Sequence, residues 1–261
     1  MHNLWERPDR LLVLPLALVA AMVVITLLSS LLTPGSAAAM LVLDYPPPAA
    51  FPFVYPFTVQ NLMHLLAFVG LGELYWRWRI AEREMALTRQ SPLPSNPKVV
   101  LGPRGLAPIR DRVRGRYDTE HGFLPRLIDI CILQFMANRS VDQTVSVLNS
   151  SLELIQHRLD LRYAMLRYLV WVIPTIGFIG TVIGISLALG QIDPQASEQP
   201  LGDIARALGV SFYTTLVALI ESAILVLLLN LVQAREEGAL NRAGDETLTN
   251  LINRLIDSDI A

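Results

Sequence analysis

The chain has 261 residues, of which 52% are hydrophobic and 17% are charged, and its formal net charge at pH 7 is −2. A mean hydropathy of +0.44 lies well above that of ordinary soluble domains and indicates a membrane protein. The near-neutral charge argues against a nucleic-acid partner. The single cysteine, Cys131, excludes an intrachain disulfide and has no metal-ligand spacing around it, so we expect it to be a core residue.

Four apolar segments are each long enough to cross a hydrocarbon layer of about 30 Å. They comprise residues 11–33, 57–76, 168–190 and 207–234. The first follows two arginines, as a signal peptide would, but it is too long for the apolar part of a signal peptide, so we interpret it as a retained anchor. The sequence therefore predicts an all-α membrane protein with four transmembrane helices in the lipid bilayer.

The distribution of basic residues predicts the orientation of these spans. Residues 77–167 hold 15 of the 21 Lys and Arg residues, residues 34–56 hold none, and residues 191–206 hold only Arg206. Basic loops remain on the cytoplasmic side of a membrane. We therefore expect both termini and the long loop to be cytoplasmic, with the loop forming a helical extension below the membrane.

In chain order, we expect an N-terminal transmembrane hairpin (residues 1–80), an irregular linker (81–122) and cytoplasmic helices (123–167). A channel domain (168–234) and a short cytoplasmic helix (235–261) should follow. The linker assignment depends on a composition rich in Pro, Gly and Arg, which opposes long helices. The last helix should be interrupted at Gly238 and Gly244. Ser140 followed by Gln143 is a capping-box pattern, which predicts the start of a helix. This helix should continue unbroken into the third span, because no Pro or Gly follows before Pro174.

The third span carries small residues at helical spacing. Pro174, Gly177, Thr181 and Gly184 lie at positions i, i+3, i+7 and i+10, which places them on one face of a helix. Gly180 and Gly184 also form a GxxxG pair, which lets another helix approach closely. The pattern is compatible with a helix-packing face alone or with the wall of a narrow pore.

The fourth span carries hydroxyl groups at similar spacing. Ser211, Thr215 and Ser222 form one stripe on the expected helix, and Thr214 and Glu221 form a second stripe about 100° further round. A single hydroxyl can bond the carbonyl four residues earlier at little cost and is usually structural. Facing stripes on two neighbouring spans favour a narrow wet passage, or close contact with a third helix that carries a polar group.

The stretches "IPTIGFIGTVIGISLAL" and "ALGVSFYTTLVALIESAILVLLLN" resemble the MotA/TolQ/ExbB proton-channel family. The resemblance covers residues 162–235, and the region before Arg139 carries none. It implies that Thr181 and Thr215 are the two pore threonines, and that Pro174 and Asn230 are the residues that open and close the signature. The four-span arrangement is similar to that of MotA.

The resemblance also implies an assembly. Family members form a homopentamer around two copies of a single-span partner resembling MotB, TolR or ExbD, which supplies an aspartate within the membrane. The implied function is a pore-forming subunit that converts ion flow into motion of this partner in a bacterial inner membrane. The ion is H⁺ or Na⁺, and we expect no cofactor, no metal site and no catalytic residue, so the protein is not expected to be an enzyme.

Glu221 departs from the family pattern, because most members have a small residue at this position. We predict that Glu221 is a protonated hydrogen-bond donor that touches a neighbouring span or a water-filled vestibule and is not the main ion carrier, since no Lys or Arg lies in any span to pair with it. His64 is interpreted as a packed or interfacial histidine in preference to a proton relay, the alternative, because its own span has no acid close enough to form such a relay. Two alternative functions remain open: a self-contained secondary transporter that uses Glu221, and a structural membrane scaffold.

Overall fold

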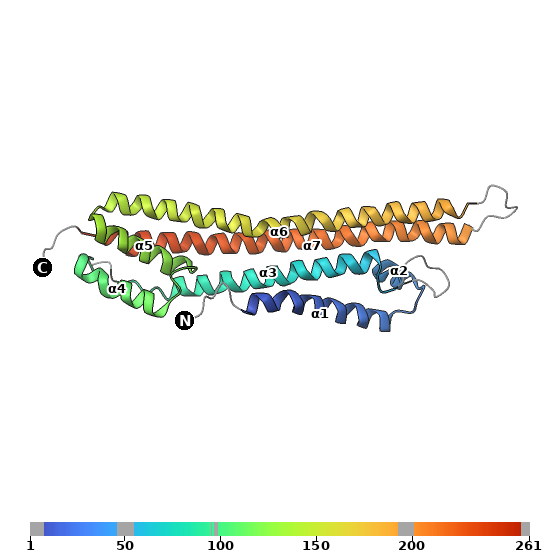
Figure 1. Cartoon of the computed structure of the whole chain (residues 1–261), viewed down its shortest axis with the longest axis horizontal. Coiled ribbons are helices and arrows are strands. Elements are labelled where there is room, and N and C mark those ends of the chain that lie inside the picture. Colours follow the sequence, from blue (N-terminus) through green and yellow to red (C-terminus); the bar gives the residue numbers. More distant parts are fainter. Residues whose placement is uncertain (1–7, 46–54, 95, 97–98, 193–200, 257–261) are drawn as a thin grey trace. The chain divides into compact units, whose positions relative to one another are not determined.

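The computed structural model describes residues 8–45, 55–94, 96, 99–192 and 201–256 (Figure 1). The regular elements of these residues are helical, which confirms the predicted all-α class. They are α1 (Pro8–Leu31), α2 (Ala37–Leu43), α3 (Val59–Arg89), α4 (Pro103–Arg116), α5 (Phe123–Asn138), α6 (Val141–Gly190), α7 (Leu201–Asn250) and a 3-10 turn, η1 (Ile252–Arg254). The chain separates into two compact units, described in turn below.

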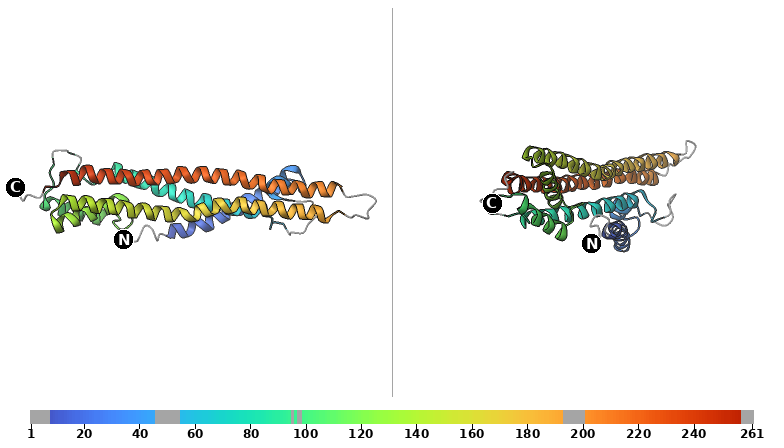
Figure 2. Two further views of the ribbon diagram at one scale, coloured as in Figure 1. Left: turned by 90° about the horizontal axis from the view of Figure 1, so that it is seen from above. Right: turned by 60° about the vertical axis from the view of Figure 1, so that its left-hand side comes forward.

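The span unit comprises Leu11–Leu74 and Ala164–Asn230, and the core unit comprises Met1–Arg10, Tyr75–Tyr163 and Leu231–Ala261. The helices α3, α6 and α7 each contribute to both units. Within each unit α6 and α7 are antiparallel neighbours, and they run side by side in the views of Figures 1 and 2.

In the described part of the chain, three helices are long and apolar enough to cross a membrane. The criterion is met by Leu12–Leu31, by α6 and by the segment Leu201–Arg254 that contains α7. The expected second span coincides with the first half of α3, whose polar residues Gln60, Asn61, His64 and Glu73 reduce its hydropathy. The presence of apolar spans therefore identifies a membrane protein, and the second of the four expected spans, residues 57–76, remains a prediction.

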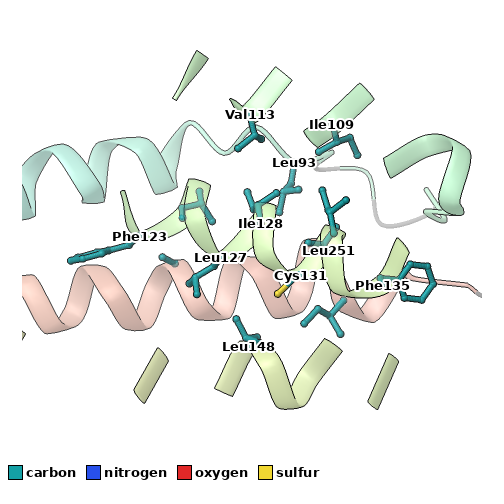
Figure 3. Packing of buried hydrophobic residues seen from close by; sticks show 14 of the residues in the cluster. Leu93, Ile109, Val113, Phe123, Leu127, Ile128, Cys131, Phe135, Leu148 and Leu251 are labelled. Atoms are coloured by element: carbon teal, nitrogen blue, oxygen red, sulfur yellow. The ribbon is translucent and has the colours of Figure 1, made fainter. Parts of the chain in front are cut away.

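The core unit is organised around α5. Phe123, Leu127, Ile128, Cys131 and Phe135 of this helix point into a continuous apolar cluster (Figure 3). Their neighbours come from the linker, α4, α6 and the chain end, and include Leu93, Ile109, Val113, Leu148 and Leu251. Cys131 is 1% exposed, which confirms its prediction as a core residue. Burial raises the pKa of its thiol to about 12, so the unreactive thiol form dominates at neutral pH.

The prediction of an irregular linker over residues 81–122 is wrong for much of that segment. The helix α3 continues to Arg89, and α4 occupies Pro103–Arg116. Proline in the first turn favours a helix start, because its missing N–H has no partner there in any case. Leu106, Ile109 and Val113 then recur on one face and are buried in the apolar cluster. Burial of this face outweighs the low helix propensity of the Pro and Gly residues.

Of the two longest helices, α6 agrees with the sequence-based prediction and α7 differs from it. The unbroken α6 is confirmed, and Ser140 Oγ accepts a hydrogen bond of 3.3 Å from Gln143 N at its start. The predicted interruption near Gly238 and Gly244 is wrong, because α7 continues through both glycines to Asn250. An added Cβ at Gly244 would lie 3.1 Å from Leu152 Cδ1, so this glycine serves close helix packing.

A buried polar network lies in the core unit. The Arg77 side chain pairs with Glu236 at 3.5 Å and lies over the Tyr163 ring, 4.7 Å from its centroid. Tyr163 Oη donates a hydrogen bond of 2.7 Å to Glu236 Oε2. On the same part of α3, Glu84 Oε2 accepts from Phe123 N at 2.9 Å and so caps the start of α5.

Glu84 makes the stability of the core unit depend on pH. Burial raises the pKa of its carboxyl from 4.5 to about 7; the charges of Glu236 and Asp118 act in the same direction, and the Phe123 N–H opposes them. Because the native pKa is raised, the stabilising contribution of the bound proton is complete below about pH 4.5 and is lost as pH rises through about 7.

We therefore expect Glu84→Gln to increase the free energy of unfolding at pH 8 by about 3 kcal/mol and to change it little at pH 5. The amide oxygen of Gln can still accept from Phe123 N. Thermal unfolding of both proteins in detergent at the two pH values tests this, with the exposed Glu120→Gln as the control. An equal effect of Glu84→Gln at both pH values would contradict the prediction.

Candidate functional site

The small residues of α6 lie directly against α7 within the span unit. An added Cβ at Gly180 would lie 2.8 Å from Thr214 Oγ1, and one at Gly184 would lie 3.0 Å from Ser211 Cβ. At Gly177 it would overlap Ala218 Cβ and lie 3.1 Å from the carbonyl oxygen of Thr214. These three glycines therefore let α6 approach α7 of the same chain closely.

Two threonines meet at the margin of this contact. Thr181 Oγ1 and Thr215 Oγ1 are hydrogen-bonded to each other across the two helices. Thr181 Oγ1 also lies 2.9 Å from the carbonyl oxygen of Ser211, and Thr215 Oγ1 lies 3.3 Å from that of Gly177, so the threonine that does not donate to its partner can donate to a backbone carbonyl. Both residues are only partly buried, so the hydroxyl pair remains open to a further element on one side.

The other predicted hydroxyl residues are buried between helices. Ser211 Oγ donates to Ala207 O at 3.0 Å, and Thr214 Oγ1 donates to Ser211 O at 2.8 Å, both within α7. Ser222 Oγ donates to the carbonyl oxygen of Val170 on α6 at 3.0 Å. These bonds join or brace the helices. Of the predicted ion-route residues, the structure thus brings together Thr181 and Thr215 and places the remaining hydroxyls in the packing.

Glu221 lies at a different place, where α7 meets α3. Its Oε1 atom is hydrogen-bonded to Nδ1 of His64, and the two side chains are 16% and 14% exposed. Glu221 thus contacts α3, and His64, interpreted from the sequence as a packed or interfacial histidine, has its acidic partner on another helix. His64 is the only basic side chain in the four predicted spans. Because a buried acid requires a partner, the sequence already contained the signal for this contact.

His64 and Gln60 of α3, together with Thr58 just before this helix, hold the short helix α2. The other ring nitrogen, Nε2, lies 2.7 Å from the carbonyl oxygen of Val42. Thr58 Oγ1 donates to Leu43 O at 2.9 Å, and Gln60 Nε2 donates to Met40 O at 3.2 Å. The last carbonyls of α2 have no partner within that helix, so these three side chains supply the missing hydrogen bonds.

A comparison with known protein families gives a match that includes α5, α6 and most of α7. Residues 123–243 match the model of the MotA/TolQ/ExbB proton channel family. The match begins at the first residue of α5, so it extends further towards the N-terminus than the motif resemblance over residues 162–235. No curated protein and no solved structure matches the chain. Residues 123–243, which include the Thr181–Thr215 pair, therefore form a domain of the MotA/TolQ/ExbB proton channel family.

Proposed function

We propose that the chain is the pore-forming subunit of an ion-driven motor complex in a bacterial inner membrane. Ion flow past the Thr181–Thr215 pair would move a single-span partner protein. The observation that carries this proposal is the hydroxyl pair itself, which joins α6 and α7, two helices apolar enough to cross a membrane, inside a proton-channel family domain.

The surroundings of the pair favour a role beyond packing. Each hydroxyl has a single hydrogen to donate, either to the other threonine or to a backbone carbonyl, and two lone pairs, so the pair keeps oxygen lone pairs with which to coordinate an ion. Apolar side chains that are more than half exposed flank the pair, including Phe178, Val182 and Phe212. Such an apolar surface, with hydroxyls at its centre, is suited to contact with another transmembrane helix.

The proposed assembly is a homopentamer around two copies of a partner that resembles MotB, TolR or ExbD. The partner would place an aspartate beside the threonines, and the transported ion would be H⁺ or Na⁺, with no further cofactor. Because the glycine face of α6 is occupied by α7 of the same chain, contacts between subunits must use other faces of these helices. In this proposal the chain crosses the membrane four times and both of its termini are cytoplasmic.

Native mass measurement of the complex tests this proposal. We expect five copies of the 29.0 kDa chain together with two copies of a single-span protein that carries an aspartate in its membrane segment. The complex should be extracted in gentle detergent from cells that express the chain with its genomic neighbours. A chain that remains a monomer or dimer with no such partner would contradict the motor assignment and favour the transporter or scaffold.

A further inference from the structure

The imidazole of His64 uses both of its nitrogens, on two different helices. Nε2 faces the carbonyl oxygen of Val42 at 2.7 Å, and Nδ1 faces Glu221 Oε1. A carbonyl oxygen can only accept a hydrogen bond, so Nε2 must carry a hydrogen. One further proton then lies between Nδ1 and Oε1, either on the ring or on the carboxyl.

The number of protons on this pair controls its charge. With one shared proton the pair is neutral overall, as imidazole with a carboxylic acid or as imidazolium with a carboxylate. A second proton would leave a net positive charge, and loss of the shared proton would leave a net negative charge. Net charge is disfavoured among apolar spans, and Glu221 Oε2 is buried with no hydrogen-bond partner in the described residues. The geometry therefore favours one bound proton.

Several other ionisable groups of the span unit lie on the helices around the pair. Glu73 follows His64 by nine residues, which places it on the opposite side of α3. Asp203 and Arg206 at the start of α7 pair with each other at 3.1 Å. The remaining described ionisable groups of the span unit are Asp44, Tyr45 and Tyr55 outside the helices, and Arg167, Tyr168 and Tyr213 on α6 and α7.

We propose that His64 and Glu221 form a proton-binding site, separate from the threonine pair, in which one shared proton joins α3 to α7. A nitrogen and a carboxyl oxygen suit a proton, whereas hard metal cations prefer several oxygen ligands. Glu221 follows Thr215 by six residues, about 9 Å along the helix axis. Through Val42 the same ring also holds α2, so the proton links three helices. The site does not require ion flow past the threonines.

Ring ¹⁵N resonances of histidine report the protonation of each nitrogen and test the site directly. The full-length protein, with ¹⁵N-labelled histidines, would be studied in lipid nanodiscs from pH 5 to pH 8. Of the four histidines, His64 is assigned by its loss in His64→Gln, and the exposed His157 serves as the internal reference. Burial raises the pKa of Asp44 to about 6, within the pH range of the experiment. Asp44→Asn is therefore included, so that any effect of Asp44 on the His64 signals can be recognised.

In the wild-type protein we expect His64 Nε2 to stay protonated throughout this range, with Nδ1 showing the intermediate shift of a shared proton. In Glu221→Gln the amide donates to Nδ1 and has no proton to share, so the Nδ1 signal should move to that of an unprotonated acceptor. Asp44→Asn should leave both signals in place. The proposal would be overturned if His64 followed His157 with pH, or if Glu221→Gln left the His64 signals unchanged.

Thermal unfolding of three variants provides a second readout. If the proton joins the helices, His64→Gln and Glu221→Gln should each lower the melting temperature, and the double variant should lower it no further than the more damaging single variant. His157→Gln is the matched control and should have no effect. Fully additive losses would contradict the proposed link. Neither measurement needs a partner or ion flux, so its outcome is independent of the motor assignment.

Discussion

Replacing Thr181 or Thr215 with valine should reduce ion flux through the assembled complex by about 10- to 100-fold. Valine keeps the volume of threonine and removes the hydroxyl. A hydrogen bond to a charged group contributes about 1.5–3 kcal/mol, and each 1.4 kcal/mol in a barrier corresponds to about a factor of ten in rate. Flux into liposomes that contain the purified complex provides the measurement.

Two further threonines provide matched controls for this experiment. Thr175 lies on the same helix as Thr181, and its hydroxyl bonds only the carbonyl of Trp171 in the described contacts. Thr214 is buried against Gly180 and belongs to the packing. We expect Thr175→Val to conduct normally, and Thr214→Val to affect stability more than flux. Normal flux in both Thr181→Val and Thr215→Val would remove the pair from the ion route.

Substitution of Gly177 with alanine should destabilise the span unit by about 1–3 kcal/mol, the usual cost of overpacking. The new methyl group would overlap Ala218 Cβ and press on the backbone carbonyl of Thr214, and neither atom can turn away as a flexible side chain would. Separation of α6 from α7 would also move Thr181 away from Thr215. We therefore expect both the stability of the assembly and its ion flux to fall, as measured by denaturant titration and liposome flux.

A compensating substitution distinguishes this clash from any general effect of alanine. Ala218→Gly removes the opposing methyl group, so the double variant should recover most of the lost stability. Gly238→Ala introduces the same chemical change into a helix at a position with nothing within 4 Å. It should stabilise the protein by about 0.5–1 kcal/mol, because glycine is a poor helix former. If Ala218→Gly did not restore the stability lost in Gly177→Ala, the contact between residues 177 and 218 would not be the cause of that loss.

The sequence by itself determined the all-α membrane class, three of the four expected spans and the family of residues 123–243. Apolar segments longer than a bilayer is thick leave few alternatives to transmembrane helices, because backbone polar groups must be satisfied within lipid. The spacing of Gly177, Gly180 and Gly184 determined the small face of α6, since helical periodicity depends only on local geometry. Cys131 and the start of α6 at Ser140 followed from equally local rules.

Only the tertiary structure decided which partner each face contacts. Periodicity shows that Thr214 and Glu221 lie close together around a helix, but Thr214 packs on α6 and Glu221 bonds His64 on α3. His64 and Glu221 are 157 residues apart, and no local rule specifies a contact at that separation. The helix α4 was likewise missed because burial of Leu106, Ile109 and Val113, which depends on the whole core unit, outweighs the local preferences of Pro and Gly.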